Sequence, residues 1–192
     1  NYSSGKMGFA LAEACAERGA EVTLVAGPVS LKTHHPAIKR IDVESAGEMY
    51  QAAMTAFPSS DAAILCAAVA DYRPENASEQ KIKRETEREM TLHLVPNPDI
   101  AASLGAIKRE GQVMVGFALE TNDEATHAEG KLKRKNLDFI VLNSLRDQGA
   151  GFRCDTNKIT IIDNAGGVTS YPLKTKREVA CDIVNKLVTF LK

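Results

Sequence analysis

The chain contains no tryptophan, and only 5% of its 192 residues are aromatic. It has no excess of charge of one sign, because 24 basic and 25 acidic residues leave a net charge of −1. This balance indicates neither nucleic acid nor an anionic membrane as a partner. No apolar run reaches the roughly 18 residues that span a bilayer, and no signal peptide precedes the first predicted helix.

Familiar catalytic and metal-binding signatures are also missing. The four cysteines form no C-x-x-C pair, and Cys15, Cys66 and Cys181 stand within apolar patterns, which predicts reduced core thiols in a cytoplasmic protein. The four histidines show no H-x-x-x-H or H-E-x-x-H spacing, so we expect no zinc site. Without a G-x-S-x-G elbow, a covalent hydrolase is not indicated either.

What is present is an alternation of apolar strand patterns and amphipathic helix patterns. It predicts an α/β fold, namely a Rossmann-like, doubly wound, mostly parallel sheet with helices on both faces and a C-terminal β-hairpin. We expect strands at 21–26, 39–43, 61–70, 90–95, 113–119 and 139–142, helices at 6–18, 46–57, 98–109, 123–136 and 176–191, and the hairpin at 158–163 and 168–171.

Residues 1–192 are interpreted as a single nucleotide-binding domain. The sequence opens on NYSSGKMG, which runs straight into the first predicted helix, so we expect a strand that feeds this loop to lie upstream. Free backbone N–H groups, a glycine and a lysine at a helix start suit a phosphate. The candidate phosphate ligands are Ser3, Ser4, Gly5 and Lys6. The Gly-Lys-Ser/Thr order of a Walker A loop is missing, and a serine-capped helix with a glycine hinge is the alternative.

A second candidate site follows the apolar stretch 61–70. Ligands of open α/β sheets bind beyond the carboxyl ends of strands. Ala67, Ala68 and Ala70 are small enough to let a base or sugar approach the backbone, and Asp71 could reach a ribose hydroxyl or help to hold a metal. Alternatively, the alanines pack against a helix and Asp71 is a turn residue.

Residues 71–89 are too polar to bury themselves and are predicted to form a mobile surface loop. Lys81 and the basic residues after it could close over a triphosphate and neutralise its charge. Weaker candidates are the segment 97–100, Phe117, and the lysines Lys131 and Lys135 one helical turn apart. The alternatives are a solvated basic run, a core phenylalanine and a helix end that complements the helix dipole.

Together these segments resemble the bacterial phosphopantothenate–cysteine ligase family, the synthetase half of the bifunctional coenzyme A biosynthesis protein. The resemblance covers nearly the whole chain in order. It rests on residues 1–8, 67–73 (AAVADYR), 81–84 (KIKR), 97–100 (NPDI), 116–121 (GFALET) and 131–136 (KLKRKN). Arg84 departs from the family pattern, where lysine is common. Neither the family's first strand nor its flavin-dependent decarboxylase half is visible.

The resemblance implies a ligase that joins 4′-phosphopantothenate to cysteine with CTP and Mg2+ (or Mn2+), whose ligands are not identified. The carboxylate would attack the α-phosphate of CTP and release pyrophosphate. The cysteine amine would then attack the acyl cytidylate and release CMP. FMN would belong only to a fused or associated decarboxylase domain. The resemblance also implies a homodimer, with the predicted hairpin as a candidate interface.

Site residues are implied in the same way. Lys81 would belong to a flap that closes over the substrates, and the amide of Asn1 would stabilise charge on the acyl carbonyl oxygen. Nucleotide contacts are implied at Leu65, Cys66, Ala67, Asp71, Lys81, Pro98, Asp99, Ile100, Ala101, Phe117, Lys131 and Lys135. One alternative is an NAD(P)-dependent Rossmann-type reductase, although the chain has no G-x-G-x-x-G. Another is a non-catalytic nucleotide-binding module, which would need no basic flap.

Overall fold

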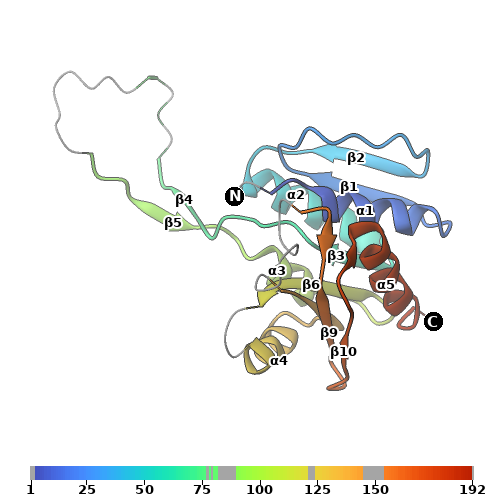
Figure 1. Cartoon of the computed structure of the whole chain (residues 1–192). Coiled ribbons are helices and arrows are strands. Elements are labelled where there is room, and N and C mark those ends of the chain that lie inside the picture. Colours follow the sequence, from blue (N-terminus) through green and yellow to red (C-terminus); the bar gives the residue numbers. More distant parts are fainter. Residues whose placement is uncertain are drawn as a thin grey trace.

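The computed structural model describes residues 3–76, 78, 80–81, 90–120, 124–144 and 154–191. At its centre is a mixed five-stranded sheet in the order β10-β9-β7-β6-β3 (Figure 1). The three strands β3, β6 and β7 are parallel, and β9 and β10 continue the sheet as an antiparallel hairpin. Their bounds are β3 Ala62–Leu65, β6 Val113–Glu120, β7 Phe139–Ser144, β9 Ile159–Asp163 and β10 Val168–Ser170. The α/β class and the C-terminal hairpin are therefore confirmed.

Helices cover both faces of this sheet, as predicted. α1 (Lys6–Ala16) and α5 (Lys176–Val188) pack on one face. The other face carries α2 (Ala46–Ala56), the short helix η1 (Phe57–Ser59), α3 (Ile100–Ile107) and α4 (Glu124–Arg134).

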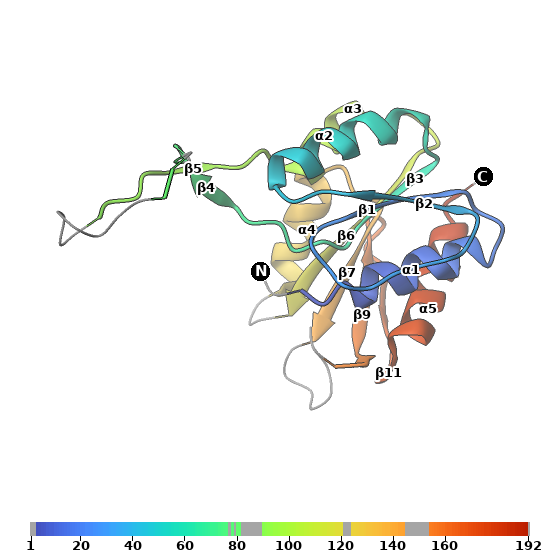
Figure 2. The ribbon, with the colours of Figure 1, turned by 90° about the horizontal axis from the view of Figure 1, so that it is seen from above.

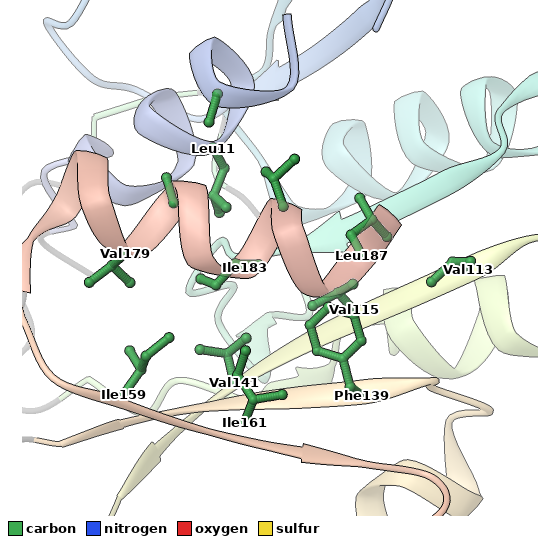
Figure 3. Packing of buried hydrophobic residues seen from close by; sticks show 13 residues of the cluster. Leu11, Val113, Val115, Phe139, Val141, Ile159, Ile161, Val179, Ile183 and Leu187 are labelled. Atoms are coloured by element: carbon green, nitrogen blue, oxygen red, sulfur yellow. The ribbon is translucent and has the colours of Figure 1, made fainter. Parts of the chain in front are cut away.

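The strands of the main sheet contribute side chains to two hydrophobic cores, because successive side chains of a strand point to opposite faces of the sheet. Val141 lies with Ile183 in the core under α1 and α5, as Figure 3 shows. Its neighbours Ile140 and Leu142 lie in the core under α3 and α4. Each face of the sheet therefore has a core of its own.

Local sequence explains where several helices begin. The Ser45 side chain accepts a hydrogen bond from the Glu48 N–H and caps α2, as predicted. Thr175 and Glu178 form a capping box that starts α5. The strands β1 (Val22–Ala26) and β2 (Ile38–Asp42) pair in parallel, and among the described residues they form a sheet of their own.

The region after β3 differs from the prediction. The expected strand 61–70 ends at Leu65, and the expected edge strand at 90–95 is β5 (Leu94–Pro96), which does not join the main sheet. β5 instead pairs antiparallel with β4 (Tyr72–Pro74), inside the stretch predicted as a loop. This pair, which we call the ribbon, extends away from the rest of the chain in Figures 1 and 2. Alternating apolar residues indicate a strand but do not specify its partner, which explains the error. Residues 82–89 of the predicted loop lie outside the described residues.

Two further strands were not predicted. β8 (Thr156–Asn157) and β11 (Lys174–Thr175) pair antiparallel, and two residues are too few for a periodic pattern. Among the helices that the structure describes, none is both long and apolar enough to cross a membrane.

Candidate functional site

The carboxyl ends of β3, β6 and β7 share one edge of the sheet, because the three strands are parallel. Leu65, Cys66 and Ala67 lie at the end of β3, and Phe117 lies in the second half of β6. Open α/β sheets bind ligands at this edge. Most of the predicted site residues that the structure describes come from elements adjoining it.

The start of α1 has the form expected of an anion-binding helix end. Its N-cap is Gly5, with a φ of 75°, and no described side chain caps the helix. The N-cap is thus the glycine and not a serine, but Ser3 Oγ and Ser4 Oγ accept hydrogen bonds from the Gly5 and Lys6 N–H groups at 3.4 and 3.5 Å, as the serine alternative expected in part. A side chain at position 5 would be strained, and its Cβ would lie 3.1 Å from Val29 Cγ1.

Lys6 and Cys66 come together around Lys176, a residue that the sequence did not single out. The buried Lys176 ammonium donates a hydrogen bond to the Cys154 carbonyl oxygen. Burial, with the nearby Lys6 ammonium, lowers the pKa of Lys176. Burial also raises the pKa of the Cys66 thiol to about 12, against the opposing charge of Lys176. A thiol with so high a pKa is protonated at neutral pH, and Cys66 packs against the core under α1 and α5.

Asp99 and Lys135, both predicted as nucleotide contacts, meet directly. Asp99 Oδ1 caps α3 by accepting from the Ala102 N–H at 3.0 Å, and Lys135 Nζ lies 3.0 Å from Asp99 Oδ2. Burial raises the pKa of Asp99, but the Ala102 and Lys135 hydrogen bonds outweigh it and leave the pKa below its usual value. Lys131 lies one helical turn before Lys135.

Gly105 permits this meeting of α3 with the end of α4. A Cβ on Gly105 would collide with the Lys135 carbonyl group, so no larger residue fits without a shift of the backbone. The Asn136 side chain also donates to the Gly105 carbonyl oxygen at 3.0 Å. The Asp99–Lys135 pair therefore depends on close packing of two helices.

Asn97 joins the segment after β3 to the segment before α3. Its side chain donates to the Ala70 carbonyl oxygen at 2.9 Å, and its backbone N–H donates to the Asp71 carbonyl oxygen at 2.8 Å. Asp71 and the segment Pro98, Asp99, Ile100 and Ala101 are thereby held side by side. Ala67, Ala68, Ala70 and Asp71 are exposed, so the alanines do not pack under a helix.

The predicted residues divide between the two faces of the sheet. Cys66 and Phe117 pack against the core under α1 and α5, whereas Leu65 and Ile100 pack against the core under α3 and α4. Lys81 is exposed in the segment that joins the strands of the ribbon, and the structure does not bring it to the other site residues. Asn1 lies outside the described residues.

Asn143, at the end of β7, is a further polar residue of this edge. It is buried, and its side-chain oxygen has no hydrogen-bond partner among the described residues. Buried polar atoms are nearly always satisfied, so such an acceptor marks a place for a donor. In the sequence, the only signal that points to Asn143 is that it ends an apolar strand pattern.

This arrangement defines a Rossmann-like α/β protein with polar residues gathered at the carboxyl edge of its sheet. The chain belongs to the family described as DNA/pantothenate metabolism flavoprotein C-terminal domain, which matches residues 1–191. This agrees with the resemblance found in the sequence.

Three similar proteins add detail. The chain is 57% identical over 191 residues to a "Cysteine/Cysteine sulfinic acid decarboxylase" of an unknown prokaryotic organism, covering 100% of this chain and 53% of that protein. It is 47% identical to the "Coenzyme A biosynthesis bifunctional protein CoaBC" of Vibrio parahaemolyticus, covering 97% of this chain and 47% of that one. The crystal structure of the C-terminal domain of a CoaBC protein superposes with a TM-score of 0.82 at 37% identity, covering 100% of this chain and 85% of that one.

The chain spans about half the length of the curated relatives that it matches. The names of the two relatives differ, since one names a decarboxylase and the other a bifunctional protein of coenzyme A biosynthesis. Since this chain corresponds to only part of each protein, a name given to the whole does not decide which half performs which reaction.

Proposed function

We propose that this chain is the synthetase part of a CoaBC-type protein, a CTP-dependent ligase that joins 4′-phosphopantothenate to cysteine. The observation that carries the proposal is its match to the CoaBC C-terminal domain structure at 37% identity over the whole chain. The lysines and helix N-termini at the carboxyl edge support it, because they suit a polyanionic nucleotide.

The reaction divides into two steps. The phosphopantothenate carboxylate attacks the α-phosphate of CTP, which forms an acyl–phosphate bond and releases pyrophosphate. The cysteine amine then attacks the acyl carbon, and the amide bond forms as CMP leaves. The first step brings two anions together, so cationic groups beside the phosphates accelerate it.

We assign the start of α1 (Ser3, Ser4, Gly5, Lys6) to the phosphates of the substrates. The exposed backbone at Ala67 and the Asp99–Lys135 pair, with Lys131 nearby, would contact the sugar and base of the nucleotide. Lys81 would act by closing over the triphosphate, and Asn1 by donating to the acyl carbonyl oxygen as it gains charge. The Asn143 side-chain oxygen, which has no hydrogen-bond partner within the described part of the chain, would accept a hydrogen bond from a donor of the ligand.

The described residues fit a metal ion that is bound mainly by substrate. They contain no group of three carboxylate, histidine or cysteine side chains suited to a metal, whereas Mg2+ commonly uses one or two carboxylates with substrate phosphates. The exposed carboxylate of Asp71 would be such a ligand. Mg2+ or Mn2+ bound there would neutralise phosphate charge.

The wider setting of the chain is part of the same proposal. We expect residues 1–192 to act as one synthetase domain fed by an upstream strand and fused to, or associated with, a decarboxylase domain that holds FMN. The four cysteines are free thiols, which suits the reducing cytoplasm.

We place the homodimer interface on the ribbon and the residues just before β5, rather than on the C-terminal hairpin expected from the sequence. Tyr72 and Leu94 of the ribbon, and Met90 and Leu92 just before β5, are each more than half exposed. An isolated pair of strands is marginally stable in water, so these apolar side chains favour burial against a second copy.

The decisive experiment measures pyrophosphate release by a full-length protein that contains this sequence. Phosphopantothenate, cysteine and Mg2+ are supplied with CTP, ATP, GTP or UTP in separate reactions. We expect release with CTP that depends on phosphopantothenate. Carbon dioxide release from cysteine sulfinic acid is followed in parallel. Decarboxylation without pyrophosphate release from any nucleotide would overturn the proposal.

A further inference from the structure

Lys6, at the first turn of α1, has a carboxylate partner from a distant part of the chain. Its Nζ lies 2.5 Å from Asp155 Oδ1, although 149 positions separate the two residues. The Asp155 side chain is 85% exposed and that of Lys6 is 38% exposed. The ion pair therefore lies where a ligand from solvent can reach it. Lys6, with Lys176, also lowers the pKa of Asp155, so the carboxylate is charged at neutral pH.

The backbone of Asp155 is fixed, in contrast to its exposed side chain. The Lys176 backbone N–H donates to the Asp155 carbonyl oxygen at 2.9 Å. The Lys176 ammonium, which is buried, donates to the adjacent Cys154 carbonyl oxygen. The next two residues pair with β11 as strand β8. These contacts hold the Asp155 carboxylate beside α1.

We propose that Asp155 is an intramolecular competitor for Lys6 that sets the affinity of this site for polyphosphate. A phosphate oxygen that binds the Lys6 ammonium must displace the Asp155 carboxylate or remain beside its negative charge, and both weaken binding. The same competition favours departure of pyrophosphate, because Asp155 takes Lys6 back as the product leaves. This inference rests on the proposed function, since the competing anion is the triphosphate of CTP.

The test measures binding of CTP and of inorganic tripolyphosphate to the full-length protein by titration calorimetry. Asp155→Asn should bind both ligands about two- to fivefold more tightly, the range expected for release of an exposed ion pair. Glu17→Gln is the matched control, because Glu17 forms an exposed pair with Arg177 at 2.9 Å and so links the other end of α1 to α5. It should bind both ligands as the unchanged protein does.

A double-mutant cycle with Lys6→Gln separates competition for Lys6 from a general effect of charge. In the Lys6→Gln background, Asp155→Asn should change the affinity little. An equal gain of affinity in both backgrounds would overturn the inference, as would weaker binding by Asp155→Asn, which would show that Asp155 orients Lys6 for the ligand. If Asp155→Asn tightens the binding of tripolyphosphate as expected but the protein does not bind CTP, the proposed function is contradicted. Competition between Asp155 and phosphate for Lys6 would still be supported.

Discussion

Lys6, Lys135 and Lys176 are each held by a defined oxygen atom, from Asp155, Asp99 and Cys154 respectively. Lys81 is an exposed side chain beyond β4. Replacing a held lysine disturbs a contact within the folded chain as well as any contact with ligand. Lys81 therefore offers the cleaner test of a catalytic role.

Lys81→Gln should leave the melting temperature nearly unchanged, because substitutions at exposed sites usually have little effect on stability. It should slow turnover about 100-fold if the ammonium stabilises charge in the transition state. Thermal denaturation and steady-state pyrophosphate release measure the two effects. Turnover at the unmodified rate would remove Lys81 from the mechanism.

Asn1→Asp should harm the second half-reaction more than the first. The aspartate is nearly the same size as asparagine but brings negative charge to the carbonyl oxygen that gains charge when the cysteine amine attacks. The acyl cytidylate should then accumulate, and mass spectrometry of quenched reactions would detect it. A slow overall reaction without accumulated intermediate would contradict this role.

At the scale of elements, the contact of α3 with the end of α4 places Asp99 beside Lys135, which we propose to contact the nucleotide. Gly105→Ala should destabilise the fold by about 1–3 kcal/mol, because the new methyl group meets backbone. It should also raise the KM for CTP, since Asp99 and Lys135 are carried by the two elements that must separate. Denaturant unfolding and steady-state kinetics measure these effects.

Gly130→Ala in α4 is the matched control for this change. A Cβ at Gly130 would meet nothing within 4 Å. Because alanine has a higher helix propensity than glycine, Gly130→Ala should stabilise the chain by about 0.5–1 kcal/mol. Equal destabilisation by both variants would show that the close approach at Gly105 is not the cause.

Element types and helix starts were largely predictable because they depend on local patterns. Ser45 marked the start of α2, and the apolar runs marked β6 and β7. The extent of β3 was wrong because Ala67 and Ala70 are apolar by type and yet exposed, a property that depends on neighbours distant in sequence.

The sequence offered candidate site residues one by one, but it did not show the contacts among them. Asp99 and Lys135 were both candidates, and only the packing of Gly105 against α4 shows that they pair. Lys176 and Asn143 were missed because a lysine in a first helical turn and an asparagine at a strand end are common in any α/β protein. Burial distinguishes Lys176 and Asn143 from such common residues, and the sequence does not show whether a single residue is buried.

At the scale of the whole molecule, the ribbon and the residues just before β5 should control association. Leu92→Glu combined with Met90→Glu should convert the expected dimer to a monomer in light scattering, because charge replaces exposed apolar surface. The melting temperature of the monomer should change little. Val168→Glu, at the exposed strand of the C-terminal hairpin, is the comparison and should leave the dimer intact. If Val168→Glu abolishes the dimer and the Met90→Glu, Leu92→Glu variant does not, the interface lies on the hairpin.

Stability should fall in acid, and Asp163 should contribute to the loss. The Lys186 ammonium, with the Gly167 and Ala165 N–H groups, holds the pKa of Asp163 below its usual value against the opposing effect of burial. Its stabilisation is therefore complete above the unfolded pKa of about 3.9 and disappears as the pH falls through the lower folded value.

Asp163→Asn should be less stable than the unchanged chain at pH 7, and the difference should shrink below about pH 4. Urea unfolding at a series of pH values measures the difference. A stability gap that stays constant across this range would show that Asp163 acts without its charge.

Because α1 packs against α5, this protein can complete its fold only after the C-terminal end of the chain has been synthesised. Leu11 and Ala14 of α1 share a core with Val179, Ile183 and Leu187 of α5, which is synthesised more than 150 residues later. Until then, the apolar stripe of α1 lacks the helix that shields it. A nascent chain halted before residue 176 would expose that stripe to chaperones and aggregation, and Asp155 would lack the backbone anchor that α5 supplies.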